Sequence, residues 1–312
     1  MKPIYSIVND YLIVCQHQRN LSPKTVNAYS TDIGQYKKFS ERLSTENAFI
    51  QQDSLERYLQ NLHIKYQPKT VKRKIASLKA LFKYMYLKNI IQTDPWEKIQ
   101  YHFKEALILP KTIPLHVMKE LFSILYTNKK TATSNFHIMR ATRDIAICEM
   151  LFSTGIRISE LCSIDISDMD FISQDLLIHG KGSKERIVHI GCSESFAAIL
   201  EYYKLFHPAE IKTGPFFITE SGTPVSDQSV RRMLKKYSKL LSSDIIITPH
   251  MIRHTFATAL LEADVDIRYI QKMLGHSSIH TTEIYTYVSI NKVREILETK
   301  HPRKDFQIKS DG

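Results

Sequence analysis

The segment LGHSSIHTTEIYTYV, residues 274–288, concentrates side chains that can donate, accept or transfer protons. It places His276 nine residues before one tyrosine, Tyr285, and eleven residues before another, Tyr287. Residues two apart on a helix point about 200° apart, so only one of the two tyrosines can face a given cleft. One hydroxyl is therefore available for chemistry there, and the other tyrosine is left for packing.

Two histidine pairs spaced i, i+4 make a zinc site one alternative. The pairs are His250 with His254 and His276 with His280. Against zinc, His-Met-Ile-Arg-His lacks the glutamate of an H-E-x-x-H site, no cysteine is near, and Arg253 would repel a cation. We therefore expect no bound metal, and we interpret His254 and His280 as structural.

Chemistry on a phosphodiester without a metal ion has a different set of requirements. Guanidinium groups must hold the charge that grows on the nonbridging oxygens, and a nucleophile, a base and an acid must complete the reaction. The chain contains every part, in the order Arg157, Lys181, His250, Arg253, His276 and Tyr285. Each residue taken alone is typical of surface charge, whereas their joint order and spacing favour phosphodiester chemistry.

Helices and one β-hairpin are expected to position these residues. An apolar helical run ends at Thr154 and Gly155, so Arg157 lies just past the break, where its side chain can enter a cleft. The β-rich runs of DLLIHGKGSKERIVHI predict a hairpin with Lys181 on its turn. From residue 224 onward the periodicity is again helical. The expected fold class is mainly α with a small antiparallel β-sheet.

The first hundred residues carry most of the net charge of +11, with 16 Lys and Arg against 8 Asp and Glu. Two segments there begin with Pro-Lys-Thr and continue with helical periodicity. In the second segment one stripe is apolar, formed by Val71, Ile75, Leu78, Phe82 and Met85. Another stripe carries Lys72, Lys79 and Lys83. DNA contact and a solvated lysine face both explain this second stripe. Trp96, the sole tryptophan, is expected to be a packing anchor.

The length of 312 residues favours two domains, and a stretch with three prolines favours a linker between them. We expect the first domain at 1–97, the linker at 98–114 and the second domain at 115–312. Four cysteines without a C-x-x-C pair, no secretory segment and no run of about eighteen apolar residues favour a reduced, cytoplasmic protein without a membrane span.

Several motifs resemble those of the tyrosine recombinase (integrase) family, most closely its Xer-type members. They are TGIRISEL, HGKGSKERIVHI, TPHMIRHTFATALLEADVDIRYIQKMLGHSSIHTTEIYTYV and KHPRK. The resemblance covers nearly the whole chain. It implies that 1–97 is a helical, SAM-like core-binding domain and that 115–312 is an α+β catalytic domain, the two forming a clamp around DNA.

The resemblance also implies a role for each member of the six-residue set. Arg157 and Arg253 match the arginines that hold the scissile phosphate. Lys181 matches the hairpin lysine that protonates the departing 5′ oxygen. His250 and His276 match two histidines that bind the phosphate and assist proton transfer.

Of the two tyrosines, Tyr285 matches the family's nucleophile, which forms a covalent 3′-phosphotyrosine and frees a 5′ hydroxyl. Because that ester stores the bond energy, rejoining needs no ATP, and the guanidiniums replace a metal ion, so no cofactor is implied. Tyr287 is assigned to packing. Glu160, three residues after Arg157, is a candidate to orient that guanidinium.

The implied function is site-specific recombination through a Holliday junction. The implied partners are double-stranded DNA with paired recombination sites and three further subunits, in a homo- or hetero-tetramer. Xer-like dimer resolution and mobile-element integration or excision both fit. A catalytically silent, sequence-specific DNA-binding accessory protein and a type IB topoisomerase are the alternatives, and the intact set of six argues against the first.

Two further segments carry expectations. YTNKKTATSNFHIMRATRD is expected to form a long loop, over about 126–142, before the first catalytic helix. SINKVREILETKHPRK predicts an amphipathic helix with Ile290, Val293, Ile296 and Leu297 on one side. The resemblance implies that this exchange helix is donated to a neighbouring subunit, and packing on its own domain is the alternative.

Overall fold

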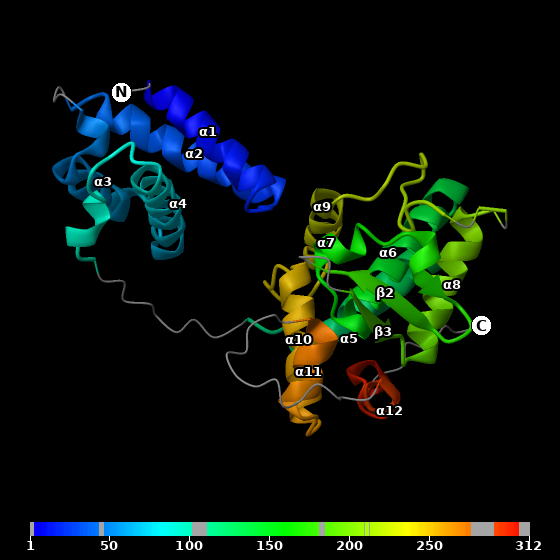
Figure 1. Cartoon of the computed structure of the whole chain (residues 1–312). Coiled ribbons are helices and arrows are strands. Elements are labelled where there is room, and N and C mark those ends of the chain that lie inside the picture. The colour runs from blue at the N-terminus through cyan, green and yellow to red at the C-terminus, as the bar shows by residue number, and fades with distance from the viewer. Residues whose placement is uncertain are drawn as a thin grey trace. The chain divides into compact units, whose positions relative to one another are not determined.

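The computed structural model describes residues 3–43, 47–101, 111–180, 185–208, 210–211, 213–275 and 290–305. The chain divides into two compact units, Met1–Ile108 and Leu109–Gly312, which are described separately (Figure 1). In the described residues helices dominate, and the one sheet has three short strands. The fold is mainly α with a small antiparallel sheet, as predicted.

The described part of the amino-terminal unit is entirely helical. Its elements are α1 (Ile4–His17), α2 (Pro23–Ser40), η1 (Ala48–Ile50), α3 (Gln52–Lys65), α4 (Pro68–Leu87) and η2 (Pro95–Lys98). Helices α2 and α4 begin at the two predicted prolines. Proline has no backbone N–H, and at the first helical position an N–H would have no partner within the helix, so none is lost there. The predicted apolar stripe of α4 is buried. Trp96 is 5% exposed and lies edge-on to Phe82, so its packing role is confirmed.

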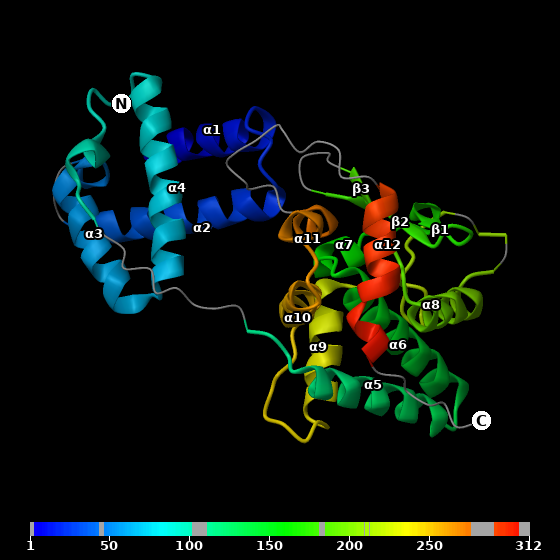
Figure 2. The same ribbon diagram turned by 90° about the horizontal axis from the view of Figure 1, so that it is seen from below.

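The carboxy-terminal unit is built around one long helix, α6, against which α5, α8 and α10 pack (Figure 2). The helices are α5 (Leu115–Lys130), α6 (Asn135–Thr154), α7 (Ile158–Leu161), η3 (Ile166–Asp168), α8 (Ser193–Phe206), α9 (Asp227–Ser238), α10 (Pro249–Glu262), α11 (Ile267–Leu274), α12 (Ile290–Lys300) and η5 (Pro302–Asp305). Helix α6 is buried from Ala141 to Thr154 apart from Arg143, which explains why its sequence reads as an apolar run.

The sheet has the strand order β1-β2-β3. Its strands are β1 (Met169–Asp170), β2 (Asp175–His179) and β3 (Glu185–His189). β2 and β3 are antiparallel, with Leu177 opposite Ile187, and form the predicted hairpin. Leu176, Ile178 and Val188 are buried while Ile187 is exposed, so alternate residues face the core.

The break after α6 is made by Gly155, whose φ of +62° lies in the left-handed region that ends helices. The glycine is also required by packing, since a Cβ there would lie 2.4 Å from Cδ1 of Phe256. The chain then turns through Ile156 and presents Arg157 as the N-cap residue of α7.

The prediction of a long loop at 126–142 is wrong. Helix α5 continues to Lys130 and α6 begins at Asn135, so only 131–134 links them. The segment is polar because these helix ends are exposed, and exposed helix ends share their composition with loops. The Ser134 hydroxyl accepts the backbone N–H of His137 and caps α6.

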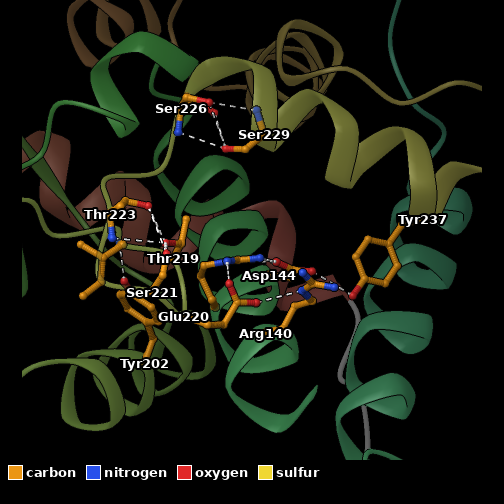
Figure 3. Close-up of polar contacts among 12 residues, drawn as sticks. Arg140, Asp144, Tyr202, Thr219, Glu220, Ser221, Thr223, Ser226, Ser229 and Tyr237 are labelled. Atoms are coloured by element: carbon orange, nitrogen blue, oxygen red, sulfur yellow. Dashed lines mark hydrogen bonds and ion pairs between the residues drawn. The ribbon is translucent and has the colours of Figure 1, made fainter. Parts of the chain in front are cut away.

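A polar network fixes α6 to two other parts of this unit (Figure 3). Arg140 and Arg143 donate to the two carboxylate oxygens of Glu220, each at 2.8 Å, which ties α6 to the turn before α9. The Tyr237 hydroxyl of α9 donates to Asp144 of α6 at 3.2 Å. Burial raises the pKa of Asp144 even though Arg143 opposes the shift. The network therefore fixes α9 to the same helix that ends at Gly155.

The amphipathic tail helix, α12, lies on its own domain in this single chain. Leu297 is fully buried and Ile296 is 7% exposed, in a cluster with residues of α10 and α11. At Gly191, after β3, a Cβ would meet the Leu297 backbone carbonyl carbon at 2.6 Å, so the helix needs a glycine there. Arg294 forms an ion pair with Asp175 of β2 at 2.7 Å.

The residues after α12 are anchored in the core of the same unit. The His301 Nε2 lies 2.9 Å from the Ser153 carbonyl, to which it donates, and His301 Nδ1 accepts the Arg303 N–H. The acceptor role of Nδ1 requires a neutral imidazole, and burial lowers the pKa of His301 to about 4. Arg303 and Glu149 form an ion pair at 3.2 Å, with side chains 2% and 0% exposed.

Within the ranges that the structure describes, no helix is both long enough and apolar enough to span a bilayer.

Candidate active site

Arg157 occupies the position that the sequence predicted, immediately beyond the end of α6. Its side chain is 37% exposed, so part of the guanidinium is accessible. Nη1 donates to Oε1 of Glu160 at 2.7 Å, and Nη2 donates to the Gly275 carbonyl at 3.1 Å. The predicted partner Glu160 therefore does hold this arginine, and it also accepts the Arg157 backbone N–H at 2.8 Å.

Arg253 reaches the same place from α10 and is 6% exposed. Its Nη1 donates to the Gly155 carbonyl at 2.7 Å, and its Nη2 donates to the Leu274 carbonyl at 2.6 Å. Burial, together with repulsion from Arg157, lowers the pKa of Arg253 to about 10. The group is still cationic at neutral pH, but its charge is poorly compensated, and an anion in the site would compensate it.

A third arginine, Arg186 of β3, joins these two and was missed at the level of sequence. Nη1 and Nη2 donate to Oε1 and Oε2 of Glu160 at 3.0 and 2.8 Å. Burial alone raises the pKa of Glu160, but hydrogen bonds from Arg186 and Arg157 outweigh it and lower the pKa to about 2. The carboxylate is therefore ionised at any physiological pH. The one signal in the sequence is the alternation of β3, because neighbouring residues of a strand face opposite sides and Arg186 therefore points away from the side of the exposed Ile187.

The three arginines meet at the carboxyl end of α11. Three consecutive carbonyls, of Met273, Leu274 and Gly275, each accept from a different guanidinium: Arg186, Arg253 and Arg157 in that order. The last carbonyls of a helix have no partner within it and carry the negative end of its dipole, so cations are favourable there. Gly275 has φ +62°, and a Cβ on it would lie 2.9 Å from Nη1 of Arg186. The carboxyl end of α11 thus holds the three guanidiniums side by side.

His250 lies in the first turn of α10, three residues before Arg253, and its side chain is exposed. Residues three apart share a helix face, so His250 and Arg253 are on one side of α10. Lys181, His276 and Tyr285 lie outside the described residues, as do Tyr287 and His280. Two of these follow closely on described positions, since α11 ends at Leu274 and β2 ends at His179. The structure brings together Arg157 and Arg253 of the predicted six.

The two histidine pairs that were weighed as a zinc site and set aside can be followed only in part, because His276 and His280 lie outside the described residues. Among the residues that are described, no three His, Cys, Asp or Glu side chains gather as a metal site. His254 of the first pair is partly buried on α10.

The lysine stripe of α4 has mixed surroundings. Lys72 and Lys83 are exposed, and the Lys83 ammonium lies 5.1 Å from the centroid of the Tyr86 ring. Lys79 is half-buried, with its ammonium 5.0 Å from the Tyr101 ring centroid. Two neighbouring cations are already engaged, because Arg73 and the buried Lys74 both pair with the buried Asp32. The exposed side chains of Lys72 and Lys83 lie on the surface of this unit, whereas that of Lys74 is buried.

The site therefore combines three guanidinium groups at the end of α11 with a histidine, His250, on the same side of α10 as Arg253. Such a site is suited to binding phosphate and to chemistry on a phosphodiester. Comparison with known proteins agrees. Residues 120–292, more than half of the chain, match the family described as "Phage integrase family". Residues 8–89 match "Phage integrase, N-terminal SAM-like domain".

Curated relatives match along almost the full length. A "Tyrosine recombinase" of Agathobacter rectalis is 51% identical, covering 98% of this chain and 99% of the relative. A "Tyrosine recombinase XerC" of Thermodesulfovibrio yellowstonii is 31% identical, covering 95% and 96%. Among solved structures, the Tn1549 transposon integrase in complex with transposon right end DNA covers 94% of this chain and 98% of its own at TM-score 0.65 and 20% identity. That likeness shows the fold.

The chain belongs to the phage integrase family and is most similar to its Xer-type members. It is a tyrosine recombinase, an enzyme that breaks and rejoins DNA at specific sites. The accessory-protein and topoisomerase alternatives are not favoured.

Proposed function

We propose that Arg157 and Arg253 bind the nonbridging oxygens of the scissile phosphate. The observation that carries this proposal is the convergence of the two guanidiniums on consecutive carbonyls of the α11 end. In that position they can stabilise the charge that grows in the transition state. His250, on the same face of α10 as Arg253, assists in binding the phosphate.

The remaining steps are assigned to residues that follow the described elements. The Tyr285 hydroxyl attacks the phosphorus while His276 assists removal of its proton, and the bond to the 5′ oxygen breaks. Lys181 protonates that leaving oxygen, so the products are a 3′-phosphotyrosyl ester and a 5′ hydroxyl. Attack by a 5′ hydroxyl from a second duplex reverses the step, and one round of exchange yields a Holliday junction.

We further propose the partners and the setting. The partners are double-stranded DNA with paired sites, bound by four subunits that are either identical or of two kinds. The domains at 1–97 and 115–312, joined by 98–114, would enclose each site, with Lys72, Lys79 and Lys83 meeting phosphates. In the tetramer α12 would leave its own domain for that of a neighbour. All four cysteines are free thiols, which fits the reducing cytoplasm.

Two biological roles remain within this proposal. Xer-like dimer resolution is supported by the likeness to the XerC relative, and mobile-element integration or excision is the second candidate. Mapping the DNA sites that the protein occupies in its host decides between them, since one chromosomal site favours the first and the ends of an element favour the second.

The chemical proposal is tested on a nicked suicide duplex in excess EDTA. Wild-type protein should form a covalent adduct there, and Tyr285→Phe should bind the duplex normally without forming one. Tyr287→Phe is the matched control and should still form the adduct. Adduct formation by Tyr285→Phe would contradict the assignment of Tyr285 as the nucleophile. A requirement for zinc would support a metal site at the paired histidines.

A further inference from the structure

Arg186 connects the hairpin to the phosphate-binding arginines, and the mechanism above gives it no task. Its side chain is 14% exposed, and all three guanidinium nitrogens are engaged. Nη1 and Nη2 bind the two oxygens of Glu160, and Nε donates to the Met273 carbonyl at 2.9 Å. The Arg186 guanidinium therefore binds groups of the protein itself, and we assign it no direct contact with a substrate.

The charges around Glu160 explain why a second arginine is useful there. A carboxylate 2.7 Å from Nη1 of Arg157 fixes that guanidinium, but by itself it also cancels the charge needed to attract a phosphate. Arg186 offsets the carboxylate, so that Arg157, Glu160 and Arg186 together stay cationic. With Arg253 added, three guanidiniums stand against one carboxylate.

The geometry also restricts how Glu160 can move. Its two oxygens accept four hydrogen bonds, from the backbone and Nη1 of Arg157 and from both terminal nitrogens of Arg186. Without Arg186, Oε2 loses one donor and Oε1 loses one, and the carboxylate becomes free to rotate onto Arg157 alone. A bidentate pair of that kind would draw the guanidinium away from the phosphate.

We propose that Arg186 is a positioning residue for strand cleavage, which holds Glu160 in place and offsets its charge so that Arg157 keeps its attraction for the scissile phosphate. This inference rests on the proposed function. The competing explanation is that Arg186 only ties β3 to the end of α11.

The test is single-turnover cleavage of a nicked suicide duplex. Arg186→Gln should cleave about 10- to 100-fold more slowly, by analogy with the loss that follows removal of a side chain that orients a metal ligand. Glu160→Gln combined with Arg186→Gln restores the net charge of the cluster, and it should cleave faster than Arg186→Gln alone. A purely structural tie predicts that the double variant is no faster. Arg140→Gln, which removes an arginine from a more exposed ion pair with Glu220 outside this cluster, is the control for loss of one positive charge and should cleave at close to the wild-type rate.

A second substrate separates charge from folding. When the scissile phosphate is replaced by an uncharged methylphosphonate, the deficit of Arg186→Gln relative to wild type should shrink. Arg186→Lys, which keeps the charge but cannot make both carboxylate bonds, should cleave at an intermediate rate and replaces Arg186→Gln if that variant fails to fold.

The outcomes are distinguishable. If wild-type protein forms no adduct, the proposed function fails. If wild type cleaves and the Arg186 variants cleave equally fast, or the deficit is the same on both substrates, the inference about Arg186 is overturned while the proposed function stands.

Discussion

Replacing Gly155 by alanine should destabilise the carboxy-terminal unit by about 2–5 kcal/mol. The left-handed φ of +62° costs a residue with a Cβ about 1–2 kcal/mol. The added Cβ would lie 2.4 and 2.9 Å from Cδ1 and Cε1 of the fully buried Phe256 and 3.0 Å from Cδ2 of Leu274. Overpacking of that kind costs about 1–3 kcal/mol. Because the Gly155 carbonyl also accepts from Arg253, the backbone shift should slow DNA cleavage as well.

The matched control is Gly222→Ala, since Gly222 has φ +79° but no atom within 4 Å of an added Cβ. The two variants share the backbone cost, so the difference between them measures the clash alone. Calorimetry of the full chain records the unfolding of both units, and the change caused by Gly155→Ala should appear in the transition that Trp96 fluorescence does not follow. Fluorescence of Trp96, which is buried in the amino-terminal unit, should give an unchanged transition in both variants. Equal destabilisation by the two substitutions would refute the packing argument.

Two further predictions concern DNA affinity and the tail. Replacing Lys72, Lys79 and Lys83 by glutamine should lower the slope of log affinity against log salt by about 0.9 for each phosphate contact removed, and by less for the half-buried Lys79, whereas an unchanged slope would support a solvated face. Acidification should release the tail, because burial lowers the pKa of His301 from about 6.5 in the unfolded chain to about 4 in the folded protein. The stability that neutral His301 contributes is complete above the unfolded pKa and is lost as the pH falls toward the folded pKa. The anisotropy of a dye on the carboxyl terminus should therefore fall between these pH values, and a His301→Gln variant that shows the same pH dependence would refute the role of this histidine.

The sequence by itself determined the features that depend on neighbouring residues. Prolines mark the starts of α2 and α4, Gly155 marks the end of α6, and alternation around a glycine turn marks the β2–β3 hairpin. These signals are local because helix starts, helix stops and hairpins are made by residues a few positions apart. The fold class followed from these signals, and the order of the six candidate residues was read directly from the sequence. Composition misled at 126–142, where exposed helix ends have the polarity of a loop.

Only the tertiary structure decided which groups surround the candidate residues. Arg186 contacts a carbonyl 87 positions away, Arg157 one 118 positions away, and Arg303 a carboxylate 154 positions away. In this single chain the structure shows α12 on its own domain, with Leu297 against α10 and α11, and donation of the helix to a neighbouring subunit stays a proposal. Periodicity states which face of an element is buried, but not what it is buried against. Partners of that kind come together only when separate elements pack around a common core, and a buried charge is stable only where that packing supplies its counter-charge.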